Sequence, residues 1–170
     1  INKIEKNSNL IFDKIFISGK SEGKYLSIED WIEKKKVNPT VDSILKIDVE
    51  GDEYKILNSV NKNFFLKFKI IIIEFHNLHY LFNEKFFFLF QDIIQKIINN
   101  FYCVHIHPNN DVDFIKKNKN IIIPPVMEFT FINKKNSKIS NQKLRFPNKL
   151  DSDNNPDKRS IVLPECWNVA

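Results

Sequence analysis

The segment KIIIIEFH, residues 69–76, constrains the fold more than any other part of the sequence. It contains four consecutive isoleucines with no polar residue between them. Such a run is typical of a strand that is buried on both faces, as strands of parallel sheets covered by helices are. The sequence therefore predicts a strand over residues 69–76 in the interior of an α/β domain.

Strands and helices alternate on either side of this segment. SILKIDVE (43–50) predicts a second strand, and a helix is expected from Asp52 to about Val60. Strand, helix and strand with short connections indicate a mostly parallel sheet. The other predicted elements are a strand at 10–17, a helix at 27–36 with Ser27 as its N-cap, an amphipathic helix at 84–100, a strand at 102–107 and a strand within 121–133.

Composition and charge narrow the class of protein. The chain has 170 residues, of which 42% are hydrophobic, so it can bury a proper core. Its net charge of +5 invites a nucleic-acid interpretation. However, only two of the 26 basic residues are arginine, the residue whose planar fork suits phosphate and guanine. Lys, Asn, Ile and Phe share A/T-rich codons, so we attribute the charge to genome composition and do not expect nucleic-acid binding.

The sequence has no feature that indicates disulfide bonds, a metal-binding cysteine motif or a membrane span. Cys103 and Cys166 form neither a disulfide framework nor a metal-ligand spacing. The longest apolar stretch, 64–75, is interrupted by two lysines and is too short to span a bilayer. We expect a cytoplasmic protein without a membrane partner. Its α/β domain is expected over residues 1–133, followed by a polar, extended tail over residues 134–170 that packs back on the domain.

Polar side chains stand where the predicted strands end. In parallel sheets, ligands bind outside the carboxyl ends of the strands. If the strands are neighbours, these groups converge on one crevice, and Gly51 lets the chain turn sharply there. The groups are Asp48 and Glu50 after the first strand, Glu74 and His76 at the end of the second, and His105, His107 and Asn109 at the end of the third.

Each of these residues also has a structural interpretation. Asp48 is either a helix cap or an active-site carboxylate. Glu50 is more readily explained as an acceptor for backbone N–H groups near Gly51. Glu74 ends an apolar strand, where an unpaired carboxylate is costly, so a functional role is favoured. His76 is the best candidate for a general base, although a hydrogen-bonded histidine at the domain edge is nearly as good an explanation.

The pair His105 and His107 lies on one face of its predicted strand. A His-x-His pair on a strand can bind a metal, but a single pair is a weak signal. We therefore expect no metal ion.

The segment LSIEDWIEKKKVNPTVDSILKIDVEGDEYKIL, followed by KIIIIEFHNL, resembles the FkbM-type S-adenosylmethionine-dependent methyltransferases. The resemblance covers about residues 26–133. K-I-D-x-E-G is its most specific motif, and E-x-H alone would not identify the family. The matching positions are Lys46, Ile47, Asp48, Glu50, Gly51, Glu53, Leu57, Glu74 and His76.

The resemblance implies a Rossmann-like methyltransferase sheet in which 44–50 and 69–76 are the fourth and fifth strands. Residues 102–107 and 126–132 would then be the last two strands, one of them antiparallel. It implies S-adenosylmethionine as cofactor and methyl transfer to a hydroxyl group, on a sugar, a surface polysaccharide or a similar small molecule. With the resemblance, we expect His76 and Asp48 to be catalytic. We expect the substrate to be bound by Glu50, Glu74, His107 and Asn109.

The chain departs from this family in its glycines. It has only three, none in a G-x-G, and there is hardly room before residue 43 for three strands. We therefore expect the first strands to be lacking, so that the chain is the carboxyl-terminal half of the enzyme. It would then need a missing amino-terminal half or a partner subunit, and we assign no cofactor-binding residue.

Two other functions stay open. The chain can be a catalytically inactive remnant or a binding subunit. A metal-dependent nuclease is the weaker alternative, because Asp48 with Glu53-Tyr54-Lys55 superficially matches a D…E-x-K site. The predicted helix carries Glu53 and Lys55 away from a neighbouring strand, so metal-binding oxygens would not converge.

Overall fold

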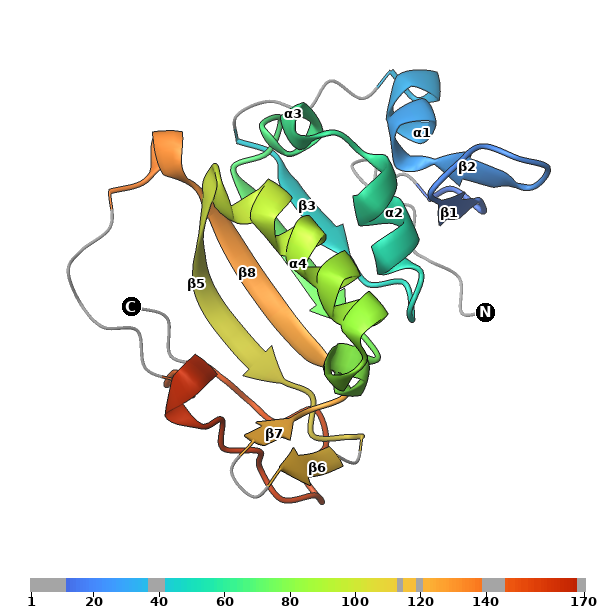
Figure 1. Ribbon diagram of the computed structural model, residues 1–170. Helices are drawn as coiled ribbons and strands as arrows, with labels where there is room; N and C mark the ends of the chain where they lie inside the picture. The colour runs from blue at the N-terminus through green and yellow to red at the C-terminus, as the bar shows by residue number, and fades with distance from the viewer. Residues whose placement is uncertain (1–11, 37–41, 113–114, 119–120, 139–145, 168–170) are drawn as a thin grey trace.

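A four-stranded sheet forms the centre of the molecule (Figure 1). The computed structural model describes residues 12–36, 42–112, 115–118, 121–138 and 146–167. The strands lie in the order β3-β4-β8-β5. Their bounds are Ile44–Ile47 for β3, Ile70–Phe75 for β4, Met127–Asn133 for β8 and Phe101–Pro108 for β5.

The sheet is mixed, so the expectation of a mostly parallel sheet is confirmed only in part. β3 and β4 are parallel, but β8 is antiparallel to both of its neighbours, β4 and β5. The short hairpin of β6 (Ile115–Asn118) and β7 (Ile121–Ile123) connects β5 to β8. The chain thus returns and inserts its last strand between two earlier ones. Local sequence patterns do not reveal such an insertion, because they carry no information about which strands pair.

Helices cover one face of this sheet. The predicted helices are present as α2 (Glu53–Ser59) and α4 (Glu84–Ile98), and α4 crosses the front of the sheet in Figure 1. Asn83 caps α4 by accepting the backbone N–H of Phe86 at 3.2 Å. Neither α3 (Lys62–Phe65) nor the 3-10 turn η1 (Leu78–Phe82) was predicted. Within the described part of the chain, no helix has the length and apolarity needed to cross a bilayer.

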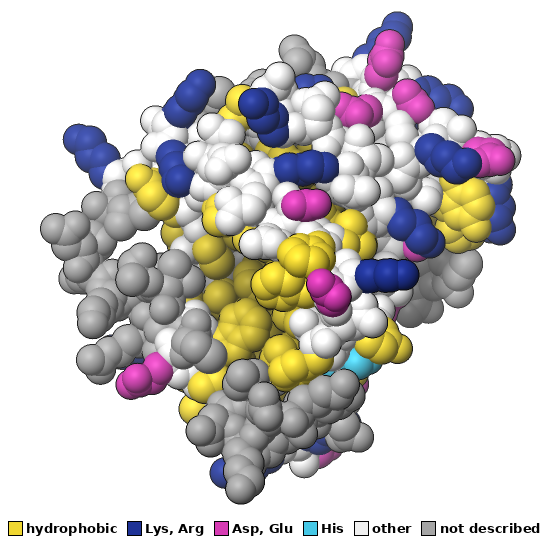
Figure 2. Space-filling view, in the orientation of Figure 1, with side chains coloured by type: hydrophobic (Ala, Val, Ile, Leu, Met, Phe, Trp, Pro, Cys, Tyr) yellow, Lys and Arg dark blue, Asp and Glu magenta, His cyan; other side chains and the backbone are white. Residues whose placement is uncertain are grey.

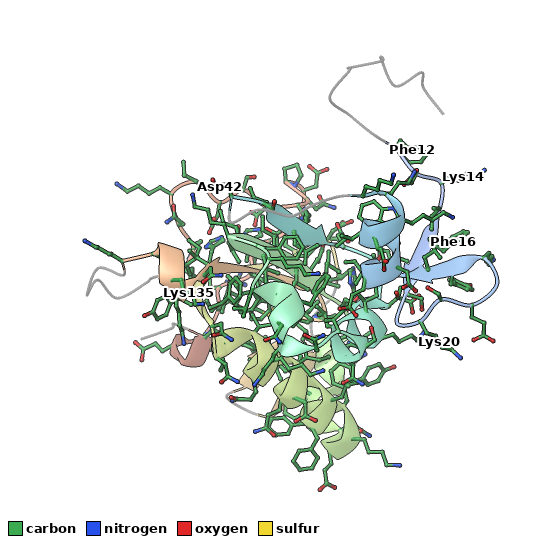
Figure 3. The ribbon with its side chains drawn as sticks, turned by 90° about the horizontal axis from the view of Figure 1, so that it is seen from above. Phe12, Lys14, Phe16, Lys20, Asp42 and Lys135 are labelled. Carbon is green, nitrogen blue, oxygen red and sulfur yellow. The ribbon has the colours of Figure 1, made fainter. Side chains whose placement is uncertain are left out.

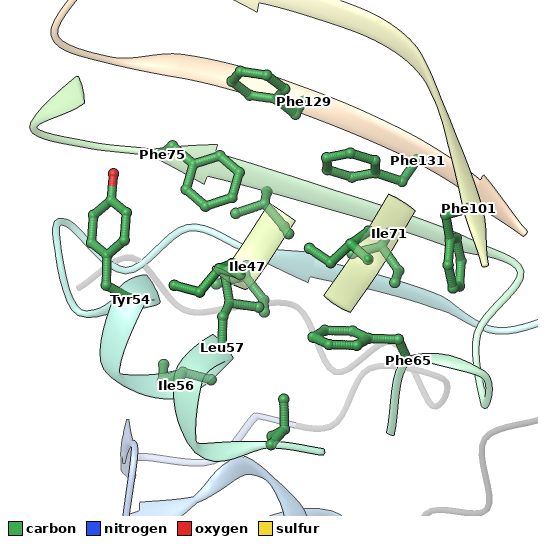
Figure 4. Packing of buried hydrophobic residues seen from close by; sticks show 14 of the residues in the cluster. Ile47, Tyr54, Ile56, Leu57, Phe65, Ile71, Phe75, Phe101, Phe129 and Phe131 are labelled. Carbon is green, nitrogen blue, oxygen red and sulfur yellow. The ribbon is translucent and has the colours of Figure 1, made fainter. Parts of the chain in front are cut away.

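The core lies between these helices and the sheet (Figure 4). Alternate residues of β4 and β8, such as Phe75 and Phe129, face the helices, and their rings pack edge to face at 5.3 Å. On the opposite face of β4, Ile72 and Glu74 are only half-buried. The expectation that residues 69–76 are buried on both faces is therefore wrong for one face.

The amino-terminal part is a small unit beside α2. It consists of the parallel strands β1 (Phe16–Ser18) and β2 (Tyr25–Ser27) and the helix α1 (Ile28–Lys34). The predicted cap is present, because Ser27 accepts the backbone N–H of Asp30 at 3.1 Å. The strand predicted at 10–17 begins only at Phe16, and its first two residues lie outside the described residues. Figure 3 shows Phe12 and Phe16 on the outer side of this unit.

The carboxyl-terminal segment, residues 146–167, lies against the sheet. Beyond β8 the chain forms the 3-10 turns η2 (Lys134–Asn136) and η3 (Glu165–Trp167). Leu163 is buried in the core, and the indole of Trp167 lies 6.3 Å from the ring of Phe129. The ring of Phe146 packs edge-on against His105 at 5.3 Å. These contacts bring a mostly polar segment next to β5.

Candidate functional site

A sharp turn follows β3 and fixes the first polar residues of the site. Glu50 and Gly51 both have positive φ, at 52° and 105°. A Cβ at Gly51 would lie 3.2 Å from the side-chain nitrogen of Asn77, which follows β4. Glycine is therefore required by the backbone conformation and by the close approach of Asn77. The turn holds the ends of the two parallel strands together.

The side chain of Glu53 joins these two strand ends. It is fully buried, and one carboxylate oxygen accepts the backbone N–H of Gly51 at 2.8 Å. The other oxygen accepts the backbone N–H of His76 at 2.7 Å. The acceptor role expected for Glu50 therefore belongs to Glu53, and that expectation for Glu50 is wrong. The sequence contained one indication that Glu53 is buried. Glu53 begins a helix, and the apolar residues that follow it face the core.

His76 lies between two carboxylates. Its side chain is largely buried, with Nε2 3.3 Å from Oε2 of the exposed Glu50. Its Nδ1 lies 3.5 Å from Oε1 of the buried Glu53 and, within the described residues, has no hydrogen-bond partner. The hydroxyl of Tyr54 donates to the backbone carbonyl of His76 at 2.5 Å. The backbone and the ring are thus both positioned by residues of α2.

Asp48, Glu74 and His76 form one group at the carboxyl ends of β3 and β4. One polar atom from each residue lies within 4.8 Å of the others. Asp48 does not cap α2, because the N-cap position is occupied by Asp52. Burial raises the pKa of Glu74, and the negative charge of Asp48 adds to this effect. A hydrogen bond of 3.1 Å from the Asn109 amide acts in the opposite direction on that pKa.

A lysine also reaches this edge of the sheet. The Nζ atom of Lys46 lies 3.2 Å from Oε2 of Glu128 on the exposed face of the sheet. This hydrogen bond raises the pKa of Lys46. Lys46, the first residue of the K-I-D motif, thus places a positive charge near the carboxylates of Asp48 and Glu74.

His107 is not part of this group. Glu74 pairs with Glu128 of β8, and Glu128 pairs with His107 of β5. His107 is therefore two strands from Glu74, or about 10 Å. It lies instead beside His105 and Asp151: Asp151 Oδ1 is 3.0 Å from Nε2 of His105, and Asp151 Oδ2 is 3.8 Å from Nδ1 of His107.

Asp151 was not singled out in the sequence. It lies in a polar, Asn- and Lys-rich segment with no periodic pattern, so nothing local pointed to it. Two groups in the described part of the chain have the residue types and spacing to hold a metal ion, Asp48-Glu74-His76 and His105-His107-Asp151.

The D…E-x-K arrangement of a nuclease is not formed. Both oxygens of Glu53 are engaged by backbone N–H groups, and Lys55 pairs with the adjacent Asp52 at 2.6 Å. In Figure 2, basic side chains are scattered among acidic ones in the upper part of the face, while hydrophobic side chains gather below them. The described residues of this face form no continuous basic stripe.

These features define an α/β protein whose polar residues gather at the carboxyl edge of a parallel strand pair, where such proteins bind ligands. The chain belongs to the methyltransferase FkbM domain family, whose model matches residues 15–116. The matched span contains Asp48, Glu74 and His76 but not Asp151. Comparison with curated proteins and with solved structures gave no match.

Proposed function

We propose that this chain forms the acceptor side of an O-methyltransferase that acts on a sugar or surface-polysaccharide hydroxyl. The observation that carries the proposal is the group Asp48, Glu74 and His76, whose polar atoms lie within 4.8 Å at the ends of two parallel strands. Family membership supplies the reaction class, methyl transfer. The group supplies the proton acceptors that a hydroxyl nucleophile needs.

Some groups of S-adenosylmethionine suit the residues at the carboxyl ends of β3 and β4, and others have no matching feature there. When bound, it would supply a methyl group from a positively charged sulfur, whose bond to that methyl group breaks to leave a neutral thioether. Its sulfonium and ammonium groups suit the carboxylates of Asp48, Glu50 and Glu74. The sequence has no G-x-G, however, for the close backbone approach that nucleoside binding uses. We therefore assign no cofactor-binding residue in this chain and derive only what the acceptor side does.

His76 is the proposed general base. Its Nδ1 faces the buried carboxylate of Glu53, so we place the imidazole proton there. This leaves the lone pair of Nε2 directed toward Glu50 and the exposed edge. An acceptor hydroxyl bound beside Nε2 can then lose its proton to the ring as its oxygen forms the new bond. Glu53 stabilises the imidazolium that results and acts as a positioning residue.

Asp48, Glu50, Glu74 and Asn109 are proposed to orient the acceptor. Asp48 is also the second candidate for the base, because its exposed carboxylate lies in the same group as His76. The carboxylate of Glu74 accepts a hydrogen bond of 3.1 Å from the Asn109 amide, which fixes the two side chains beside each other. Closely spaced carboxylates and an amide suit neighbouring hydroxyl groups, as sugars present them. His107 is two strands away and has no part in this proposed set.

The second candidate function is a binding subunit without catalysis. It is favoured by the outer edge of β3. In the described residues β3 pairs with β4 alone, and Ile44 is 59% exposed. Unpaired strand edges with apolar side chains accept strands from other chains.

The test measures transfer of a labelled methyl group from S-adenosylmethionine to a panel of simple sugars and polysaccharides. Cofactor binding is measured in parallel by calorimetry. We expect His76→Ala to lower turnover by about 10²–10⁴-fold with little change in cofactor affinity. His79→Ala, a histidine of η1 outside both groups, is the matched control and should keep full turnover.

Two outcomes would change the proposal. Unchanged turnover in His76→Ala would remove His76 from the mechanism, and Asp48→Asn would then be tested. A wild-type chain that neither binds the cofactor nor transfers methyl groups, alone or with added cell extract, would favour the binding subunit.

A further inference from the structure

His105, His107 and Asp151 form a second polar group that the proposed methyl transfer does not use. Their candidate ligand atoms all lie within 4.8 Å of one another. The two rings are nearly parallel, at an interplanar angle of 19°. Nε2 of His105 and Nδ1 of His107 each lie near a carboxylate oxygen of Asp151. Asp151 comes from the carboxyl-terminal segment, which passes beside the end of β5 (Figure 1). The group therefore links two segments that are far apart in the sequence.

The ring nitrogens of His107 make no hydrogen bond with the described residues around them. Both of its ring nitrogens are shielded from solvent, and within the described residues neither has a hydrogen-bond partner. Asp151 does not remedy this, because its Oδ2 is 3.8 Å from Nδ1 of His107, beyond hydrogen-bond range. A shielded imidazole without a partner is destabilising unless something binds it. A metal ion between the three residues would supply the missing partner.

The spacing of the group suits a transition metal. Histidine nitrogens and carboxylate oxygens lie about 2.0–2.2 Å from zinc, so two ligands of one ion are about 3.0–3.6 Å apart. The His105–Asp151 distance of 3.0 Å is already in this range. The longer separations, up to 4.8 Å, need a closure of only about 1–2 Å. Two imidazoles and one carboxylate are a ligand set that favours zinc over calcium or magnesium, because the latter two ions bind mainly oxygen ligands.

Asp151 is held in place by its own partners. Its Oδ2 accepts the backbone N–H of Asn148 at 2.6 Å. The buried Asn110 at the end of β5 exchanges two hydrogen bonds of 2.8 Å with the backbone of Asn155. The segment that carries Asp151 is therefore fixed beside β5 without a metal ion. Such supporting hydrogen bonds orient the ligands of protein metal sites.

A cavity of about 170 Å³ adjoins the group. His107 and Asp151 line it together with Asp153 and Ser160. Ser160 donates a hydrogen bond of 2.6 Å to Asp153, so this wall of the cavity is polar. The volume accommodates a few water molecules, which can complete the coordination of an ion held by three protein ligands. It also gives the ion a path of entry.

We propose that His105, His107 and Asp151 bind one divalent transition-metal ion, zinc in the first instance. The ion ties the carboxyl-terminal segment to β5. This site lies two strands from the Asp48-Glu74-His76 group and does not depend on the proposed methyl transfer.

The test is a calorimetric titration of Zn²⁺ into the whole 170-residue chain after treatment with EDTA. We expect one zinc ion per chain at this site. His107→Ala and Asp151→Asn should each weaken binding by more than about a hundredfold, because ligand loss exceeds the cost of losing a supporting partner. His79→Ala is the control and should bind as the unaltered chain does. Circular dichroism without zinc checks that each variant is folded.

Three results would overturn the proposal. The first is absence of zinc binding in the unaltered chain. The second is undiminished binding in a folded Asp151→Asn or His107→Ala variant. The third is loss of binding in Glu74→Gln with retention in Asp151→Asn, which would move the ion to the other group.

A second measurement needs no variant. X-ray absorption of the zinc-loaded, unaltered chain distinguishes imidazole nitrogen from carboxylate oxygen ligands. We expect two imidazoles, as His105 and His107 provide. A spectrum with one imidazole, which is what the Asp48-Glu74-His76 group would give, would contradict the site proposed here.

Discussion

The buried carboxylate of Glu53 accepts the backbone N–H of His76 at 2.7 Å, although the two residues are 23 positions apart. The same carboxylate accepts the N–H of Gly51. One side chain therefore fixes the turn after β3 relative to the end of β4. The spacing between Asp48 and His76 depends on this connection, so Glu53 controls the geometry of the site without being part of its exposed surface.

Replacing Glu53 should destabilise the fold. In Glu53→Ala, the buried N–H of His76 and the half-buried N–H of Gly51 lose their acceptor, and we expect the free energy of unfolding to fall by about 2–4 kcal/mol. Urea unfolding followed by circular dichroism measures this change. Glu33→Ala, at an exposed position of α1, should stay within about 0.5 kcal/mol of the wild type. An equal effect of the two substitutions would show that Glu53 does not hold the turn.

Gly51 and Gly23 allow backbone strain to be separated from steric contact. Both have positive φ, but a Cβ at Gly51 would meet Asn77 at 3.2 Å, whereas a Cβ at Gly23 would have no neighbour within 4 Å. We expect Gly51→Ala to cost about 2–4 kcal/mol and Gly23→Ala about 1 kcal/mol. Thermal melting of the two variants side by side tests this order. The reverse order would mean that the approach of Asn77 does not constrain the turn.

The raised pKa of Glu74 predicts a pH dependence of stability. Burial, reinforced by Asp48, lifts this pKa above its ordinary value of 4.5. The folded protein therefore holds the Glu74 proton more tightly than the unfolded chain does. The stability that this proton provides is complete below pH 4.5 and is lost as the pH rises through the folded pKa.

Glu74→Gln removes this titration and keeps an acceptor for Asn109. As the pH is raised from about 4 to about 7, the wild type loses the stability that the Glu74 proton provides and the variant does not. We therefore expect the melting temperature of the variant minus that of the wild type to increase over this range. Melting curves of both proteins across this range measure the difference. A difference that does not change with pH would contradict the raised pKa.

The thiol of Cys103 should react slowly. Burial raises its pKa to about 12 from 9.0, which lowers the thiolate fraction roughly a thousandfold near neutral pH. In a Cys166→Ser variant, where Cys103 is the remaining cysteine, we expect a thiol-specific dye to react far more slowly than with free cysteine. Reaction should become fast when urea is added. Rapid labelling of the folded variant would show that Cys103 is accessible.

Local patterns in the sequence predicted the elements that have a clear period. The apolar run of β4 and the capped helix α1 are where the sequence places them. The position of β8 between β4 and β5 was not predictable, because it depends on pairing between distant segments rather than on local propensity.

In the candidate site, too, the residues marked by local sequence patterns were predictable and the contacts between distant segments were not. Asp48, Glu74 and His76 follow from the rule that ligands bind at the carboxyl ends of parallel strands, and they do lie together. The structural role of Glu53 was missed because the N–H of His76 comes from another element. Asp151 was missed because its histidine neighbours lie on β5. For a buried acid or an aspartate in a polar segment, the residue itself does not show what it will contact.

The insertion of β8 also sets the order in which this chain can fold. β5 is made before β8, yet among the described strands it pairs with β8 alone. Until residue 133 leaves the ribosome, β5 lacks the described strand with which it pairs, and β4 lacks one of its two neighbours. The sheet therefore closes only once β8 has been made, and a nascent chain that stops before β8 leaves the isoleucine-rich edge of β4 uncovered for chaperones or other unfinished chains to bind.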